Sequence, residues 1–93
     1  MAVSRADRRA DREARVLAVF GSESTPTVLD LLELVELAWH DCYSEVSPSE
    51  DLIDDVLLLS GGELEKLVSV ARLAVTDWRD VKVAAADHRN RRR

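Results

Sequence analysis

The chain has few of the residues that break regular structure and almost none of those that form disulfides. Its 93 residues include two prolines, three glycines and one cysteine. A lone cysteine, Cys42, cannot form an intramolecular disulfide. No segment alternates apolar and polar residues with period two, so strands are not indicated. The sequence therefore predicts neither a disulfide-bonded scaffold nor a β-rich fold.

Long apolar stretches are also missing. Runs such as Val56–Leu59 are far shorter than the roughly 20 residues that cross a bilayer as a helix. Charged residues, rather than an apolar segment with a cleavage site, follow Met1, so no secretion signal is visible. With a single cysteine, these features predict a cytoplasmic protein that has no membrane partner.

Apolar residues make up 46% of the chain and charged residues 33%, a composition typical of a globular protein. The length suits a single domain over residues 1–93. A domain this small buries a limited share of its surface. Association with a second copy or with a partner would therefore stabilise it.

Charge is sorted along the chain, whose net charge is −5. Residues 1–15 carry a local charge of +2 and residues 88–93 carry +4, whereas the part between them has fifteen acidic and four basic residues. The basic tail 89–93 supplies the candidate phosphate-binding residues, Arg89, Arg91, Arg92 and Arg93. The alternative is that these cations only complement the negative end of a helix dipole. Neither basic segment contains an aromatic residue, so base stacking is not indicated.

Helix signals are strong, and the spacing predicts helices over 3–20, 26–46, 48–59 and 62–88. Three helix starts can be named. Thr25 precedes Pro26 as an N-cap, Ser47 and Glu50 fit a capping box, and so do Ser60 and Glu63. Gly21 ends the first helix, and Gly61 and Gly62 end the third.

The faces of these helices predict an all-α, small four-helix bundle with a short third helix and a long fourth one. The helix over 26–46 is apolar around most of its circumference, so it is expected at the centre. The helix over 62–88 would be about 40 Å long, so its end would project past the core or pack on another chain. Both features predict a homodimer, and the expected interface residues are Leu31, Leu34, Leu37, Val70 and Leu73.

The first helix is weaker, because its inner face consists largely of alanine. We expect its basic start, within residues 1–15, to be partly disordered in the absence of a partner. Trp39 and Trp78 are both expected to be buried, since each lies on an apolar helix face.

No arrangement of residues predicts catalysis, and we expect no catalytic residue, no metal and no cofactor. On a helix, His40 and Cys42 point in different directions, so they cannot form a nucleophile pair, and Cys42 is expected in the core. Glu36 and His40 share a polar face, which we expect to be solvated. A metal bundle built on this pair remains an alternative, although such bundles use Glu-x-x-His spacing. The acidic residues Glu50, Asp51, Asp54 and Asp55 are explained by the helix N-terminus that they follow.

The five residues from Leu59 to Glu63, with the sequence LSGGE, resemble the signature motif of ABC-transporter ATPases. Such an ATPase also needs a phosphate loop of the form G-x-x-x-x-G-K-[ST], which the three glycines of this chain cannot provide. We therefore interpret the motif as a turn between two helices.

Two functions follow as hypotheses. The first is a protein–protein interaction or regulatory module that acts as a homodimer and also binds an unidentified protein partner. The alternative is a nucleic-acid-associated accessory protein that binds phosphates through its N- and C-terminal arginine segments. Salt should distinguish them, because phosphate binding weakens steeply as ionic strength rises.

Overall fold

The computed structural model describes residues 4–91, and these residues contain five α-helices and no strand. The helices are α1 (Arg5–Phe20), α2 (Thr25–Tyr43), α3 (Glu50–Ser60), α4 (Leu64–Thr76) and α5 (Trp78–Arg91). The all-α class is confirmed, but the number of helices is five rather than four. Within this part of the chain, no helix combines the length and apolar character needed to cross a membrane.

The prediction of a single long helix over 62–88 is wrong, because the helix is interrupted at Asp77. This residue has extended backbone angles (φ −155°, ψ 88°), and its Oδ1 accepts a hydrogen bond of 3.2 Å from the backbone N–H of Arg79. Aspartate caps a helix start in this way. Its side-chain hydrogen bond to the backbone competes with the backbone hydrogen bonds that would continue one longer helix. As a result, α5 folds back against α3 and α4 instead of projecting from the body.

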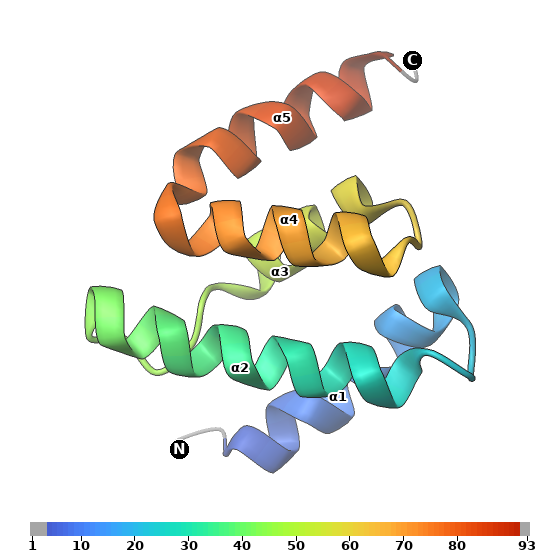
Figure 1. Cartoon of the computed structure of the whole chain (residues 1–93), viewed down its shortest axis with the longest axis vertical. Coiled ribbons are helices and arrows are strands. Elements are labelled where there is room, and N and C mark those ends of the chain that lie inside the picture. The colour runs from blue at the N-terminus through green and yellow to red at the C-terminus, as the bar shows by residue number, and fades with distance from the viewer. Residues whose placement is uncertain (1–3, 92–93) are drawn as a thin grey trace.

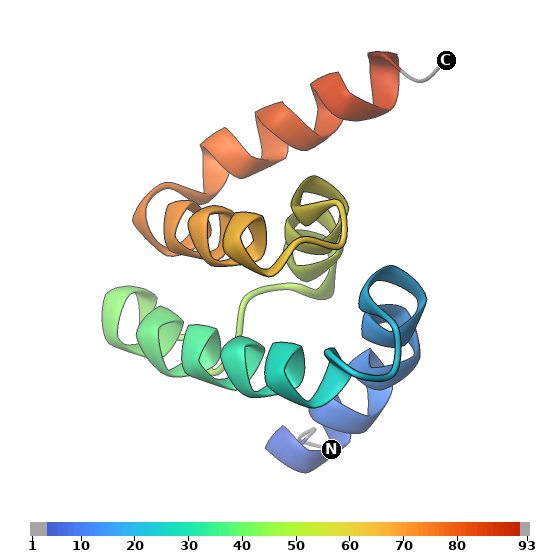
Figure 2. The ribbon, with the colours of Figure 1, turned by 45° about the vertical axis from the view of Figure 1, so that its right-hand side comes forward.

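The five helices form two groups that meet along α2 and α4 (Figure 1). In the first group α1 lies on α2, and in the second α3, α4 and α5 pack together. Two views show α2 and α4 side by side and running in the same direction (Figure 2). At their common C-terminal end, the Tyr43 hydroxyl donates a 2.8 Å hydrogen bond to the Val75 carbonyl oxygen. The molecule measures 38 × 30 × 25 Å.

The helix ends follow local rules, but two of the expected caps are shifted. Helix α1 begins at a capping box between Ser4 and Asp7 and ends at Gly21, whose φ of 82° favours glycine. For α2 the N-cap is Ser24, one residue before the expected Thr25. For α3 the N-cap is Ser49 rather than Ser47, and its Oγ accepts a hydrogen bond from the Leu52 N–H.

The third expected capping box is wrong. Ser60 is the last residue of α3, and its buried hydroxyl donates to the Leu57 carbonyl oxygen at 2.6 Å. The N-cap of α4 is Glu63, which has no side-chain capping bond. The LSGGE segment is thus the turn between α3 and α4, and Gly61 there is the C-cap of α3 in the left-handed conformation.

The core lies where the two groups meet. Its least exposed apolar side chains come from all five helices and are Val16, Val28, Leu32, Ile53, Val56, Leu67, Ala74, Val81 and Ala85. Trp39 is buried as expected, but the expectation for Trp78 is wrong, since 37% of it is exposed. The break at Asp77 moves Trp78 to the first residue of α5.

The core position expected for Cys42 is also wrong. Cys42 is exposed in the last turn of α2, where Tyr43 is the residue that reaches α4.

Candidate functional site

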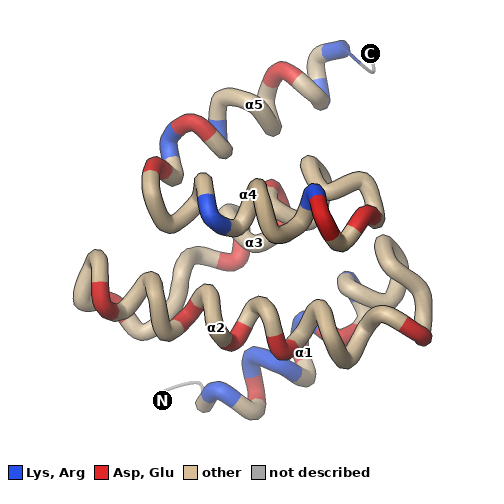
Figure 3. Tube along the Cα trace, viewed as in Figure 1, with Lys and Arg blue, Asp and Glu red and all other residues tan. Residues whose placement is uncertain are grey.

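The arginines of α1 face the acidic residues of α2 and α3 and are held by them. Arg9 pairs with Asp30 at 2.8 Å and with Glu33 at 3.0 Å. Arg12 is 1% exposed and reaches Glu36 at 2.9 Å and Glu50 at 2.7 Å. Figure 3 shows the basic residues of α1 beside the acidic residues of α2. These basic residues near the N-terminus therefore form ion pairs within the molecule.

Glu36 is the centre of this network, and the solvated face expected for it is wrong. Its side chain is 1% exposed and accepts two hydrogen bonds from Arg8, at 2.5 and 3.2 Å, and one from Arg12. It makes no hydrogen bond to His40, whose Nδ1 lies 3.3 Å from the Glu45 carbonyl oxygen. Sequence alone does not show this burial, because the cations that cover Glu36 lie 24 and 28 residues earlier in the chain.

Burial by itself would raise the pKa of Glu36, since it removes water from the carboxylate. The hydrogen bonds and charges of Arg8 and Arg12 outweigh burial and lower the pKa below its ordinary value. Glu50 follows the same pattern. Burial acts to raise its pKa, but Arg12 and Arg15 lower it. Both groups are therefore carboxylates that the fold holds in the charged form.

The acidic residues at the start of α3 receive cations from two helices. Arg15 of α1 contacts Glu50 and Asp54. Asp55 is buried and pairs with Lys82 and Arg89 of α5, each at 2.7 Å. These carboxylates thus do more than favour the N-terminus of α3, because they hold α1 and α5 against it.

The candidate phosphate-binding residues are placed unequally. Arg89 forms an ion pair with Asp55, so its guanidinium already has a buried carboxylate as its partner. Arg91 is exposed in the last turn of α5. Arg92 and Arg93 lie outside the described residues.

An apolar groove of about 300 Å³ lies between α2 and α4 on the surface of the molecule. We call it the α2–α4 groove. Its walls are Leu31, Leu34, Val35 and Ala38 from α2, and Val68, Ala71, Arg72, Val75 and Thr76 from α4. Apolar positions recur at intervals of three and four on both helices, which places them along facing edges. Leu34 and Val68 stand at the mouth of the groove with 61% and 53% exposed.

The structure brings together part of the interface expected from the sequence. Leu31 and Leu34 line the α2–α4 groove. Leu37 is exposed on α2 outside the groove lining. Val70 packs against the core, and Leu73 is exposed without lining the groove. Sequence reasoning missed Val68, although its heptad spacing to Val75 was a usable signal.

A metal site needs several ligands close together. In the described part of the chain, no group of three or more His, Cys, Asp or Glu side chains is placed to hold a metal ion. The Glu36 carboxylate, moreover, is already satisfied by arginine. The α2–α4 groove, by contrast, is a concave apolar surface with large side chains exposed at its edge. The chain matches no protein-family model, no curated protein and no solved structure with which it was compared.

Proposed function

We propose that this protein is a cytoplasmic interaction module that acts by binding and forms a homodimer through the α2–α4 groove. The observation that carries the proposal is the exposure of large apolar side chains along this groove, chiefly Leu34 and Val68. Exposed apolar surface next to a concave wall is typical of protein interfaces. The exposed thiol of Cys42 fits a reducing compartment.

The occupant we favour is a second copy, because the face is complementary to itself in shape. A two-fold dimer pairs one surface patch with the same patch on its partner. Such a patch must therefore contain both a ridge and a hollow. Here Leu34 supplies the ridge, and the groove beside it supplies the hollow.

Charge along α4 is self-complementary as well. Glu65, Val68 and Arg72 are spaced at i, i+3 and i+7, so they lie on one side of the helix. Neither Glu65 nor Arg72 has an ion pair among residues 4–91. If two copies of α4 pack antiparallel with the two-fold axis beside Val68, each Arg72 lies opposite the Glu65 of the other copy. A single axis thus pairs the apolar residues and both charges.

The direct test is the mass of the protein in solution. We expect light scattering at micromolar concentration to give about twice the chain mass of 10.4 kDa. Leu34→Asp and Val68→Asp should each give a folded monomer, because each puts a charge into the apolar contact. Val83→Asp is the matched control, since Val83 is 62% exposed on α5, away from the groove. A wild-type monomer at this concentration would contradict the proposal.

A charge exchange tests the arrangement of the two copies. Arg72→Glu and Glu65→Arg should each weaken the dimer, because like charges would then face each other. The double variant Glu65→Arg with Arg72→Glu should restore dimerisation. Weakening without restoration would rule out this axis while leaving the groove itself as the contact.

The competing function, phosphate binding through the arginine segments, has less support. Arg9, Arg12, Arg15 and Arg89 have carboxylate partners in the structure. Fluorescence anisotropy with a labelled DNA or RNA oligonucleotide at low salt tests this function. Binding that disappears as salt rises would favour it over the interaction module.

A further inference from the structure

The chain has only four aromatic residues, and three of them line one cavity. Trp39 and Tyr43 come from the end of α2, and Trp78 comes from the start of α5. The rest of the lining of this space of about 350 Å³ consists of Glu45, Ser47, Ser49, Leu52 and Lys82. We call this space the aromatic cavity. It is separate from the α2–α4 groove, and the two share no lining residue.

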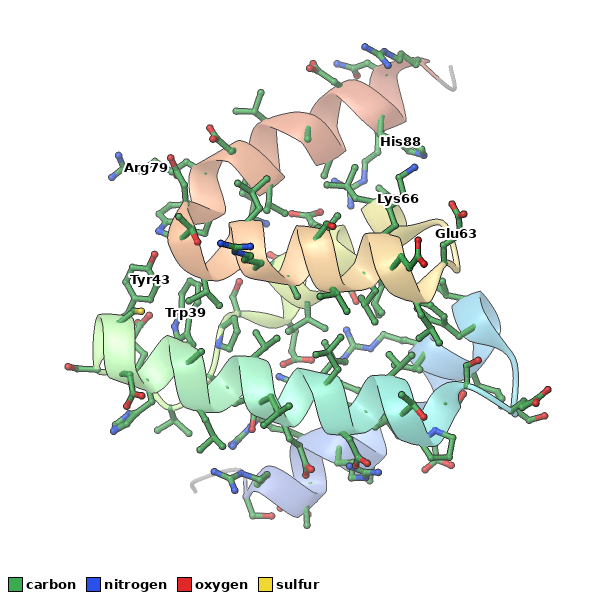
Figure 4. The ribbon with its side chains drawn as sticks, in the orientation of Figure 1. Trp39, Tyr43, Glu63, Lys66, Arg79 and His88 are labelled. Carbon is green, nitrogen blue, oxygen red and sulfur yellow. The ribbon has the colours of Figure 1, made fainter. Side chains whose placement is uncertain are left out.

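Two of the three rings of the aromatic cavity, those of Trp39 and Tyr43, are held in place without a ligand. The rings of Trp39 and Tyr43 lie against each other with their centroids 4.2 Å apart. The Tyr43 hydroxyl donates to the Val75 carbonyl oxygen at 2.8 Å, and Trp39 Nε1 donates to Glu45 Oε1 at 3.1 Å. Figure 4 shows both rings extending from α2 toward the end of α4. A site built in advance loses little entropy when it binds.

The full charge of the cavity lining favours a cation. The helix ends nearby offset one another. The C-terminal ends of α2 and α4, which the bond from Tyr43 to Val75 brings together, carry partial negative charge, whereas the N-terminal ends of α3 and α5 carry partial positive charge. The Glu45 carboxylate supplies a full negative charge. The ammonium of Lys82 is the one cation in the lining, and it is already paired with the buried Asp55 at 2.7 Å.

One of the rings already accepts a cation on the outside of the cavity. The Arg79 guanidinium lies 5.5 Å from the centroid of the Trp78 ring, and Arg79 is not part of the cavity lining. A cation over an aromatic face is attracted by the ring quadrupole, most strongly for tryptophan. Hard metal ions prefer several charged oxygen ligands, whereas the lining has three rings, two serine hydroxyls and a single carboxylate.

We propose that the aromatic cavity binds an organic cation, namely an alkylated ammonium or a guanidinium group. Trp39, Tyr43 and Trp78 surround the cation, and Glu45 balances its charge. The cation has two chemical sources, a free small molecule or the side chain of a peptide. Both present the same group to the cavity.

Calorimetry on the full-length protein tests the proposal with choline and its neutral isostere 3,3-dimethyl-1-butanol. We expect choline to bind about tenfold more tightly, because only choline gains the cation–π and carboxylate interactions. Equal binding of the two, or no binding of any cation at millimolar concentration, would overturn the proposal. Tighter binding of the anion 3,3-dimethylbutanoate would overturn it as well and would assign the cavity to Lys82.

Variants then locate the binding. Trp78→Leu and Glu45→Gln should each weaken choline binding several-fold. Trp78 is partly exposed, and glutamine retains the acceptor for Trp39 Nε1, so both variants should fold. Val83→Ala, outside the cavity, should leave the affinity unchanged. Unchanged affinity in both cavity variants would contradict the proposal. Tighter binding of the capped amino acids trimethyllysine or arginine than of choline would identify a peptide side chain as the source.

Discussion

Burying a carboxylate such as Glu36 is unfavourable unless cations replace the water that it loses. Arg8 and Arg12 supply two guanidinium groups that replace this water. The carboxylate in turn balances the charge of Arg12, which is equally buried. Removing one member of such a set leaves the others buried and underpaired.

We therefore expect Glu36→Gln to lower the free energy of unfolding by about 3 kcal/mol. Asp30→Asn is the matched control, because Asp30 pairs with Arg9 at a site where the carboxylate side chain is 71% exposed. Its cost should stay below about 1 kcal/mol. Urea unfolding followed by circular dichroism measures both. Equal losses for the two variants would mean that burial does not govern these pairs.

Acid should destabilise the protein through the same residues. The folded-state pKa values of Glu36 and Glu50 lie below the ordinary value of 4.5. Their contribution is therefore fully present above that value and is lost as the pH falls through the folded-state pKa values. In Glu36→Gln the free energy of unfolding should fall less steeply below about pH 4.5 than in the wild type. Identical slopes in pH-dependent urea titrations would contradict this assignment.

At the scale of the helices, local signals predicted most of the fold. Apolar periodicity and capping residues gave the helical class and the ends at Gly21 and Gly61. The break at Asp77 was not predicted, because the apolar pattern continues across it. The break coincides with a cap at Asp77, and α5 beyond it forms ion pairs with Asp55, a residue distant in sequence.

The candidate site was predicted only in part for a related reason. Periodicity identifies which residues lie on an apolar face, and Leu31 and Leu34 were found in this way. It does not tell which neighbouring helix covers that face. Val70 was thus expected outside but packs inward, and Glu36 was expected in water but is covered by arginine.

The turn between α3 and α4 offers a test with a close control. A Cβ on Gly62 would lie 2.8 Å from the Val19 carbonyl oxygen, whereas one on Gly61 would meet nothing within 4 Å. Both glycines have positive φ, so Gly61→Ala should cost about 1 kcal/mol. Gly62→Ala should cost clearly more, because the end of α1 must also shift. Thermal unfolding of the two variants measures the difference, and equal costs would contradict the contact.

At the scale of the whole molecule, α1 is attached in two different ways. Its N-terminal half is held mainly by arginine pairs, whereas Val16 and Phe20 near its end pack against the core. Salt screens the partly exposed pairs of Arg5 and Arg9 more strongly than the buried pairs of Arg8 and Arg12, and it does not screen apolar contacts. The two halves should therefore differ in their response to ionic strength.

We expect rising salt to increase amide hydrogen exchange in the first half of α1 before it affects α3 or α4. Mass spectrometry of the exchanged protein at low and at molar salt measures this response. Helix α4, which makes no salt bridge within residues 4–91, serves as the internal control. A uniform response along the chain would show that α1 opens only with the whole fold.

The shared burial of Glu36 and Arg12 also has an evolutionary consequence. A neutral residue at position 36 would leave Arg12 underpaired, and loss of the arginine would leave a buried carboxylate. Substitutions at the two positions are therefore not independent. In sequences descended from a common ancestor with this chain, positions 8, 12 and 36 should covary, with the acidic residue and its arginines gained or lost together.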